Sequence, residues 1–479
     1  MQLFKQSEQG KQMSSDPFAE ESAAGSKKAG KSFFRNRKLR SFQTISFSFL
    51  AVILSGSFLL MLPWATQSGR ATPFIEALFT STSATCVTGL VVQNTATYWS
   101  TFGKAVILLL IQIGGLGLVT LGAGLSVLLG RRIGLAQRSV MQTALSAPQL
   151  GGIVRFMRFV LLLTAAIEGL GAIALSFYFV PEFGLVRGIG YGFFHSISAF
   201  CNAGFDLLGQ KTPFVSLVGR AGHPLLILTV SLLILAGGLG FLTWNDILSK
   251  RFKWERYRLQ SKLVLIMTLL LVVLPALFFF FHENRTGGAL ADLSTHGKIW
   301  GAYFQAVTPR TAGFNSIPLD KLTEPGQAVI ILLMLLGGAS GSTAGGMKIS
   351  TFVIVTLTAL AVFRQRRNTL ILHRRISSST IRQALAVFTA HLSFFALGGF
   401  LISIFDRLPL MATWFESASA ISTVGLTLGI TPKLSHASHL VLIFLMYWGR
   451  VGGLTLIFAT LSKQTPDVIN YPEEDLSIG

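Results

Sequence analysis

The sequence predicts an all-α integral membrane protein in which eight transmembrane helices form four span–pore-helix–span repeats around a pseudo-fourfold pore. Three observations support this fold class. Hydrophobic residues make up 51% of the 479 residues and charged residues only 13%, about half the charged share of a typical soluble domain. Eight apolar segments are long enough to cross a bilayer, which takes about 20 residues. A short motif that ends in glycine recurs four times between these segments.

The apolar segments are separated by connections of two kinds. The segments lie at 42–62, 103–129, 156–180, 223–244, 261–281, 326–362, 383–405 and 437–461. Of the 40 Lys and Arg residues, 27 lie before, between and after the pairs of segments, in 1–42, 130–158, 249–262, 363–382 and 463–479. With eight spans these stretches share one side, which the positive-inside rule makes cytoplasmic. We therefore expect both termini in the cytoplasm. The net charge of +20 then reflects topology, and no nucleic-acid partner is expected.

The connections on the opposite side carry the repeat. Each contains an apolar stretch too short to span the bilayer, which is typical of a re-entrant helix. These stretches run from Phe79 to Gly89, Phe194 to Gly204, Phe304 to Gly313 and Phe415 to Gly425. The Phe-to-Gly separations are 10, 10, 9 and 10 residues, and successive glycines are 115, 109 and 112 residues apart. A period this constant indicates repeated structural units.

The composition of the four stretches suits a cation path. An ion that leaves water needs its hydration shell replaced, and rings of backbone carbonyls can do this. Glycine tolerates positive φ, so neighbouring carbonyls can turn toward an axis. The partly negative C-terminal end of each short helix would favour a cation there. The alternative is four kinked turns that only pack the spans together, but all four stretches keep small or hydroxyl residues before the glycine.

The repeat also sets the predicted domain boundaries. We expect a basic cytoplasmic N-terminal tail and a cytoplasmic C-terminal tail on either side of four pore repeats. The boundaries are 1–41, 42–130, 131–248, 249–363, 364–462 and 463–479.

The second span of the third repeat is too long for one helix. The 36 residues from 328 to 363 would make a helix of about 54 Å, against a hydrocarbon core of about 30 Å. The run GGASGSTAGGMK at 337–348 is a poor helix interior. It predicts two half-helices joined by a loop that lines a cavity or is buried in protein. A phosphate cradle is disfavoured, because the Walker spacing and a preceding strand are both missing.

Arg450 lies near the middle of the last span, about 16–20 Å from either surface. A charge at that depth costs at least about 2.5 kcal/mol, so it must face a cavity or a partner. Two alternatives remain open. Arg450 faces a cavity, or it packs against carbonyls or a carboxylate such as Glu168.

Several runs carry a resemblance to a known family. They are TCVTGL at 85–90, SAFCNAGF at 198–205, VTPRTAGFN at 307–315, STVG at 422–425 and YPEE at 471–474. The sequence resembles the Trk/Ktr/HKT superfamily of potassium transporters, and within it the membrane subunit of bacterial Ktr uptake systems. The resemblance covers roughly residues 40–479. It implies uptake of K⁺ across the bacterial cytoplasmic membrane, with no catalysis and no cofactor in this chain; activation by Na⁺ is left open.

The resemblance also assigns roles to residues. The ion-binding filter would consist of the residues that lead into each repeat glycine: Val87, Thr88, Gly89, Asn202, Ala203, Gly204, Thr311, Ala312, Gly313, Thr423, Val424 and Gly425. The gate would be an intramembrane loop that acts with an arginine, formed by Gly337, Gly338, Gly341, Ser342, Gly345, Gly346, Lys348 and Arg450. Some plant relatives replace the first filter glycine with serine and admit sodium, so Gly89 favours potassium.

The same resemblance implies partners. Ktr membrane subunits associate as homodimers on a cytosolic ring of nucleotide-binding regulatory subunits, and the C-terminus, here 471–479, contributes to the dimer contact. Membrane lipid is the remaining partner. From a different class, an alternating-access transporter for a small solute stays an alternative, although such proteins usually have two inverted repeats. An integral-membrane enzyme is disfavoured, because acids in the spans do not pair at catalytic spacing.

Overall fold

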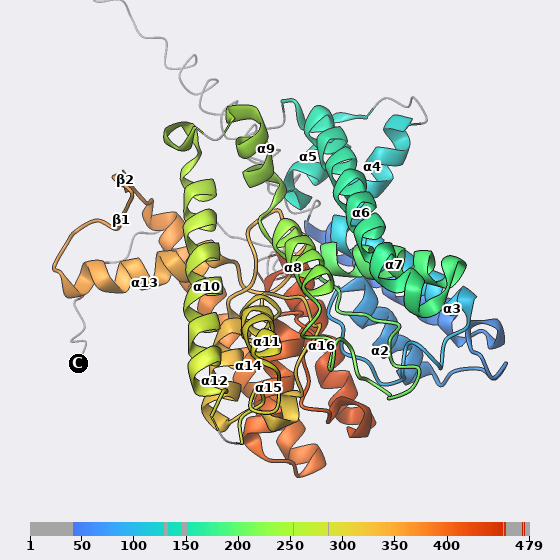
Figure 1. Ribbon diagram of the computed structural model, residues 1–479. Coiled ribbons are helices and arrows are strands. Elements are labelled where there is room, and N and C mark those ends of the chain that lie inside the picture. Colours follow the sequence, from blue (N-terminus) through green and yellow to red (C-terminus); the bar gives the residue numbers. More distant parts are fainter. Residues whose placement is uncertain are drawn as a thin grey trace, which may run out of the picture.

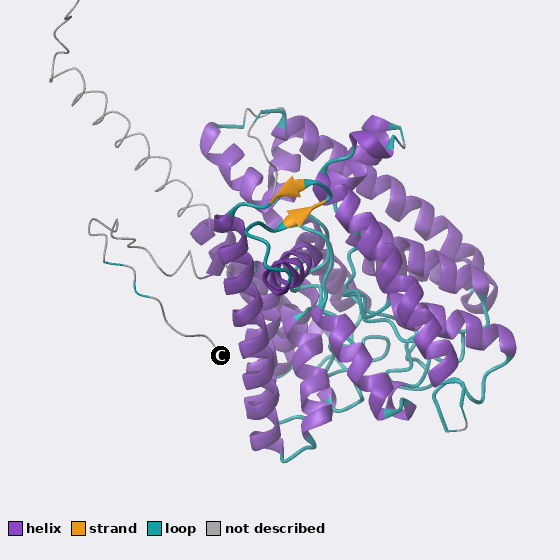
Figure 2. Ribbon diagram, turned by 90° about the vertical axis from the view of Figure 1, so that its left-hand side faces the viewer, coloured by secondary structure: helices purple, strands orange, loops and turns teal. Residues whose placement is uncertain are grey.

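The computed structural model describes residues 42–128, 133–145, 151–251, 253–285, 287–453, 455–456, 472 and 474. These residues form helices, connecting loops and one two-stranded hairpin (Figures 1 and 2). The predicted tail at 1–41 lies outside the described residues, as does nearly all of the predicted tail at 463–479.

The described helices repeat the predicted order of span, short helix and span four times. The first spans are Phe42–Met61, α6 (Ile153–Phe183), α10 (Leu259–His282) and α14 (Ser378–Asp406). The short helices are α2 (Phe74–Thr85), α7 (Leu185–Phe200), α11 (Thr295–Val307) and α15 (Leu410–Ile421). The second spans start with α3 (Thr101–Leu116), α8 (Pro224–Gly238), α12 (Glu324–Leu335) and α16 (His436–Val451). The all-helical membrane fold with pore-helix repeats is therefore confirmed.

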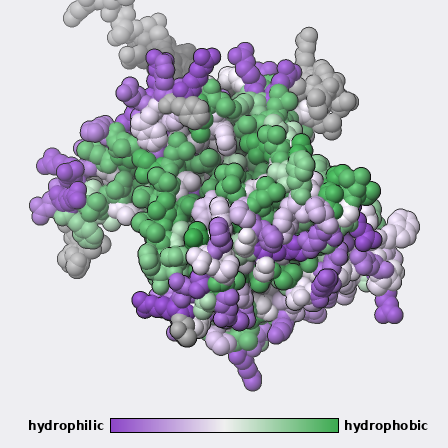
Figure 3. All heavy atoms as spheres, viewed as in Figure 1, coloured by the Kyte–Doolittle hydropathy of each residue, from purple (hydrophilic) through white to green (hydrophobic). Residues whose placement is uncertain are grey.

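Burial separates the two kinds of helix. Only 22% to 39% of the most apolar stretch of each first span is buried inside the protein. Figure 3 shows the corresponding surface on one face, with hydrophobic side chains over much of its upper and middle part and hydrophilic ones at its upper and left edges and over its lower part. In contrast, residues 415–421 of short helix α15 are all buried. Apolar surface therefore faces lipid on the outer spans, while the short helices form the interior.

The second spans differ from the sequence prediction, which expected a break only in the third repeat. In the first repeat α3 meets α4 (Leu118–Leu128) at 95°, and in the second repeat α8 meets α9 (Phe241–Lys250) at 96°. In the third repeat residues 336–348 separate α12 from α13 (Ile349–Phe363). In the fourth repeat α16 ends at Val451, with Gly452 as its C-cap residue. All four second spans therefore lose regular helical geometry.

Glycines explain where the breaks fall. A Cβ on Gly114, Gly237 or Gly449 would overlap the carbonyl oxygen near the end of the pore helix of the same repeat. Three residues later the chain leaves the helix at Gly117, Gly240 and Gly452, whose φ angles are 83°, 83° and 89°. Residues with a Cβ rarely adopt such φ values. The second spans thus approach the pore helices at backbone distance and then turn away.

Buried hydroxyls join the pore helices to the first spans. Ser81, Ser196 and Ser417 each lie two residues after the repeat phenylalanine. Each donates a 2.7 Å hydrogen bond to a backbone carbonyl of the first span of its own repeat, at Ile53, Glu168 and Phe395 respectively. The third repeat has Ala306 at this position. There Arg310 Nη2 donates to Thr268 Oγ1 of α10 at 3.0 Å instead.

The ends of the spans carry the remaining elements. The helices α4, α5 (Leu135–Ala144) and α9 lie at the upper end in Figure 1, as does the hairpin of β1 (Leu370–Ile371) and β2 (Arg374–Arg375). Turns of 3₁₀ helix lie in the connections: η1 (Pro63–Ala65), η2 (Trp254–Arg256), η3 (Leu319–Lys321) and η4 (Thr431–Lys433). In Figure 2 the non-helical segments gather in the middle of the helix bundle.

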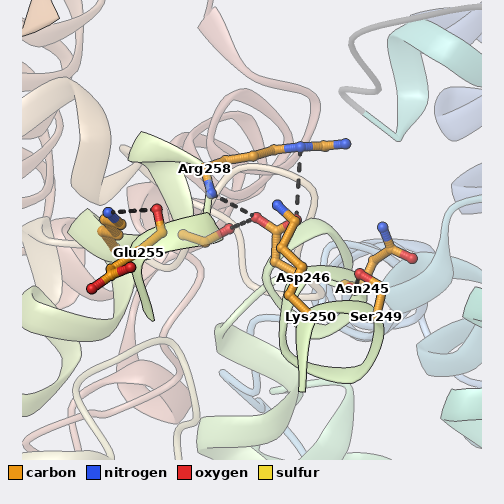
Figure 4. A network of polar contacts seen from close by, with 8 residues as sticks. Asn245, Asp246, Ser249, Lys250, Glu255 and Arg258 are labelled. Atoms are coloured by element: carbon orange, nitrogen blue, oxygen red, sulfur yellow. Dashed lines mark hydrogen bonds and ion pairs between the residues drawn. The ribbon is translucent and has the colours of Figure 1, made fainter. Parts of the chain in front are cut away.

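Asp246 fixes the connection between the second and third repeats (Figure 4). Its carboxylate accepts hydrogen bonds from Lys250 Nζ at 2.8 Å, Ser261 Oγ at 2.7 Å and the N–H of Arg258 at 3.1 Å. The side chain is only 1% exposed. Because Arg258 is the N-cap residue of α10, the carboxylate lies at the partly positive end of that helix. It thereby ties α9 to the start of the third repeat.

We expect Asp246→Ala to destabilise the protein by about 2–4 kcal/mol, because it leaves three donors without their acceptor in a buried site. Lys250→Ala removes one donor whose side chain is 26% exposed and should cost less than about 1 kcal/mol. Thermal unfolding of the purified protein in detergent measures both variants. Equal shifts of the unfolding midpoint would contradict this account of Asp246.

Candidate functional site

Each pore helix leads into a short stretch of non-helical backbone, and we call these stretches the four glycine loops (87–89, 202–204, 311–313 and 423–425). The first residue of each loop has positive φ: 59° at Val87, 59° at Asn202, 65° at Thr311 and 52° at Thr423. The glycine that ends each loop also has positive φ: 93°, 68°, 80° and 94° in chain order. The residue between them does not. Such alternation turns successive carbonyls toward the same side of the chain.

Positive φ is costly at these loop entrances. Three of the four first residues are Val or Thr, whose branched side chains make the left-handed region a genuine outlier. Strain of this kind costs about 1–3 kcal/mol per residue and persists only where the surroundings impose it. Its repetition at the same position in four repeats points to a shared task of the loops.

A hydroxyl four residues after each repeat phenylalanine imposes this geometry. Ser83 Oγ accepts the N–H of Gly89 at 3.1 Å, and Ser419 Oγ accepts the N–H of Gly425 at 3.0 Å. In the other two repeats the hydroxyl acts as donor to the carbonyl after the glycine. These bonds join Ser198 to Phe205, at 2.8 Å, and Thr308 to Phe314. All four glycine loops are therefore bonded to their own pore helix.

The four glycines close a ring in repeat order. A Cβ built on Gly89 would lie 2.6 Å from the carbonyl oxygen of Ala203, and one on Gly204 would lie 2.8 Å from that of Ala312. A Cβ on Gly313 would lie 2.5 Å from the carbonyl oxygen of Val424, and one on Gly425 would overlap that of Thr88. Each repeat thus contacts the next, and the fourth contacts the first. The ring leaves no room for a side chain at any glycine.

The ring offers backbone oxygens and few charges. Among the described residues no group of three or more His, Cys, Asp or Glu side chains could hold a metal ion. Asn202 links two repeats, because its Nδ2 donates to the Arg310 carbonyl at 3.2 Å and to Thr311 Oγ1 at 3.1 Å. Carbonyl and hydroxyl oxygens are hard ligands, which suit cations of the alkali and alkaline-earth groups rather than transition metals.

The segment 337–348, which we call the central segment, packs against the ends of two pore helices. Thr343 Oγ1 donates to the carbonyl of Phe200, the last residue of α7, at 3.0 Å. Gly346 donates its N–H to the Gly449 carbonyl at 3.1 Å. A Cβ on Gly345 would overlap the side chain of Thr423, in the glycine loop of the fourth repeat. The central segment therefore touches the ring directly.

Arg450 binds the central segment to the first repeat. Its Nη1 donates to the Thr343 carbonyl, and its Nη2 donates to the carbonyls of Gly114 and Gly115 at 2.5 and 3.0 Å. The C-terminal carbonyls of α3 carry partial negative charge, which suits a cationic partner. Glu168 is not among these partners; it accepts a hydrogen bond from Gln112 Nε2 at 3.1 Å. The guanidinium therefore pairs with backbone carbonyls, and one of these carbonyls belongs to the central segment.

A family model described as a cation transport protein, TrkH, matches residues 20–468. The chain belongs to the TrkH family. A solved structure of the TrkH potassium transporter from Vibrio parahaemolyticus has a TM-score of 0.64 over 87% of this chain and 85% of its own, at 17% identity. The shared fold of the TrkH family is thus found in this chain as well.

Curated members of the TrkH family cover nearly the whole chain. The potassium/sodium uptake protein NtpJ of Enterococcus hirae is 39% identical over 92% of this chain and 98% of its own length. The Ktr system potassium uptake protein B of Bacillus subtilis is 38% identical over 91% of this chain and 96% of its own length. The protein of the same name from Vibrio alginolyticus is 35% identical over 91% of this chain and 94% of its own length.

Other residues in or near the glycine loops and the central segment of this TrkH family member have mostly local partners. Lys348 Nζ donates to the carbonyls of Ala344 and Gly345, within the central segment. Asp206 Oδ1 accepts the N–H of Leu208 at 2.9 Å, in the connection between α7 and α8. Burial raises the pKa of Asp206 to about 6. Cys86 and Cys201 are both buried and free.

One fourfold signal in the sequence went unused in the prediction. The runs GGLG at 114–117, GGLG at 237–240, GGAS at 337–340 and GRVG at 449–452 lie at matching places in the four second spans. These runs mark the breaks in all four second spans, and they place Arg450 where the other repeats have glycine. Aligning the four second spans on these runs would have predicted the breaks.

Proposed function

We propose that this protein takes up potassium across the bacterial cytoplasmic membrane through a pore lined by the four glycine loops. One observation carries the proposal: the glycines of all four repeats contact one another in a closed ring, so the loop carbonyls surround one axis. The names of the relatives from Enterococcus hirae and Bacillus subtilis, which describe potassium/sodium and potassium uptake, support K⁺ as the transported ion.

The proposed mechanism is dehydration with replacement of the water shell. A K⁺ ion that enters the ring exchanges water for carbonyl oxygens of the residues 87–89, 202–204, 311–313 and 423–425. The alternating φ signs hold these oxygens in place before the ion arrives. The cost of reorganising ligands around the ion is therefore met when the protein folds. The C-terminal ends of α2, α7, α11 and α15 add favourable negative potential.

We further propose that the central segment and Arg450 form the gate. Gly337, Gly338, Gly341, Ser342, Gly345, Gly346 and Lys348 supply the segment, and Arg450 fixes it to α3. Because the segment lies against the ring, it obstructs the path of an ion that leaves the loops. The guanidinium adds a positive charge beside the same path, which opposes cation entry.

Gly→Ser at Gly89, Gly204, Gly313 or Gly425 should weaken discrimination of K⁺ over Na⁺ while the protein still folds. The added side chain meets a carbonyl of the next repeat and moves that carbonyl off the axis. K⁺ and Na⁺ flux in proteoliposomes measures the effect. Gly429→Ser is the matched control, since Gly429 also has a positive φ, of 87°, but a Cβ there would have no neighbour within 4 Å. Unchanged selectivity in all four variants would refute the filter.

Arg450→Ala, or deletion of part of 337–347, should raise K⁺ flux, because either change removes an obstruction from the ion path. Arg450→Lys separates the effect of the charge from that of the hydrogen bonds that hold the central segment. A lysine keeps the charge but cannot bridge three carbonyls. Flux close to that of the unchanged protein would therefore assign the gate to the charge, and raised flux would assign it to the hydrogen bonds. A fall in flux for Arg450→Ala at normal protein levels would contradict this gate.

We propose that the protein works as a homodimer on a cytosolic ring of nucleotide-binding subunits. Whether Na⁺ also activates it is left open. A loop-gated K⁺ path needs a regulator, and the described residues form no nucleotide-binding domain. Exposed basic side chains at the proposed cytoplasmic end, such as Arg364, Arg374 and Arg375, suit an acidic docking surface. Similarity to the Ktr relatives supports this assembly.

Removal of residues 471–479 should abolish the dimer, because the resemblance assigns the C-terminus to the dimer contact. Light scattering of the full-length and truncated proteins in detergent gives the mass directly, and the full chain should have about twice the monomer mass of 51.9 kDa. A monomer at full length, or a dimer unaffected by truncation, would contradict this assembly and leave the pore untouched.

A further inference from the structure

The residue after the repeat phenylalanine is buried and polar in all four pore helices. These residues are Thr80, His195, Gln305 and Glu416, each at most 2% exposed. Four buried polar side chains at one position need partners, because an unpaired buried polar group costs about 1–3 kcal/mol. The hydrogen-bond partners of these side chains differ between repeats. In the second and fourth repeats a partner lies in the segment after the glycine loop.

In the second repeat His195 holds the chain beyond the glycine loop. Its Nε2 accepts the N–H of Leu207, three residues after Gly204, at 3.3 Å. Its Nδ1 lies 2.8 Å from the Tyr191 carbonyl. An acceptor at Nε2 requires the proton on Nδ1, so the imidazole is neutral and donates to Tyr191. The ring thereby connects the pore helix to the segment that follows the loop.

In the fourth repeat Glu416 holds the equivalent segment. Its carboxylate accepts from the hydroxyl of Thr427 and, at 3.0 Å, from that of Thr431. Thr427 lies two residues after Gly425, and Leu207 lies three residues after Gly204. An imidazole and a carboxylate thus both bond the segment after the glycine in two opposite repeats of the ring.

The other two repeats do not make this connection from the residue after the phenylalanine. Both polar atoms of the Gln305 amide are buried with no hydrogen-bond partner among the described residues. The segment after Gly313 is bonded instead to the second repeat, where Leu217 donates its N–H to the Asn315 carbonyl at 3.0 Å. In the first repeat the acceptor lies one helical turn earlier, at Glu76, which binds Gln93 at 2.9 Å.

We propose that His195 and Glu416 are positioning residues that set K⁺ selectivity by fixing two opposite loops at their outer ends. This inference rests on the proposed filter. Both side chains act through the segment after the glycine, His195 through the N–H of Leu207 and Glu416 through the hydroxyls of Thr427 and Thr431. Neither needs to touch the ion. Gln305 has no such role, although it occupies the same position.

The experiment compares Leu and Gln substitutions at His195 and Glu416 with a Leu substitution at Gln305. His195→Leu and Glu416→Leu remove the acceptor and should lower the K⁺/Na⁺ flux ratio by about 2- to 10-fold, the range expected for one net hydrogen bond. His195→Gln and Glu416→Gln keep an acceptor and should restore most of the ratio. Gln305→Leu is the matched control and should leave the ratio unchanged. The ratio and the half-saturating K⁺ concentration are measured together in proteoliposomes.

Each outcome has a definite reading. Loss of selectivity in Glu416→Gln equal to that in Glu416→Leu would assign the effect to charge and overturn the positioning role. Leu variants with an unchanged ratio, or an equal fall in Gln305→Leu, would also overturn it. Gly→Ser at Gly89, Gly204, Gly313 and Gly425, run in parallel, separates the two proposals, because an unchanged ratio in all four variants refutes the filter itself. Should Glu416→Leu fail to fold, Thr431→Val removes a donor from the loop side and should lower the ratio in the same direction.

Discussion

The structure depends on one constraint: four stretches of backbone must leave helical geometry inside a membrane protein and still hold their carbonyls in place. Backbone at this depth is tolerated only where protein or a water-filled cavity surrounds it. The chain meets the requirement with paired positive φ values, at the first residue and at the glycine of each loop. Hydroxyls of Ser83, Ser198, Thr308 and Ser419 bond each loop to its pore helix. The close contacts of the second spans with the pore helices follow from the same need, since they leave no space for lipid behind the loops.

A single chain allows its four repeats to differ, and the differences gather in the third. That repeat is one residue shorter between phenylalanine and glycine, and it has Ala306 where the others have serine. Arg310 replaces the missing bond by reaching Thr268, while its Nε and Nη1 have no protein partner among the described residues. The second span of the same repeat contains the longest break, the central segment. The repeat that lacks the pore-helix serine is thus also the one whose second span has the longest break. In a tetramer of identical subunits this specialisation is impossible.

Much of this arrangement could be predicted from the sequence, and the misses have a physical cause. The repeat period located all four pore helices and all four glycines, because the glycines need a backbone that other residues rarely adopt. The bends at Gly117 and Gly240 were not predicted, since glycine is common in membrane helices and apolar length alone suggested continuous spans. The sequence around Arg450 could not decide whether its side chain faces the pore or packs against other parts of the protein. Its partners are backbone carbonyls of Thr343, Gly114 and Gly115, which have no sequence signature. Contacts such as His195 to Leu207 likewise depend on how a loop returns to its helix.

The contacts of the central segment also limit how the proposed gate can work. Six described hydrogen bonds join it to other parts of the chain: to Phe200, Gly237, Gly238 and Phe241 of the second repeat, and to Gly449 and Arg450 of the fourth. At about 0.5–1.5 kcal/mol each, breaking half of them costs about 1.5–4.5 kcal/mol. The closed arrangement would then outweigh an open one by roughly 10- to 2000-fold. A regulator must supply this difference through tighter binding to the open state. Thr343 bonds Phe200, two residues before one glycine loop, and Gly345 lies against Thr423 in another. If the central segment is the gate, its opening would therefore release the pore-helix end at Phe200 and act on the proposed filter by direct contact.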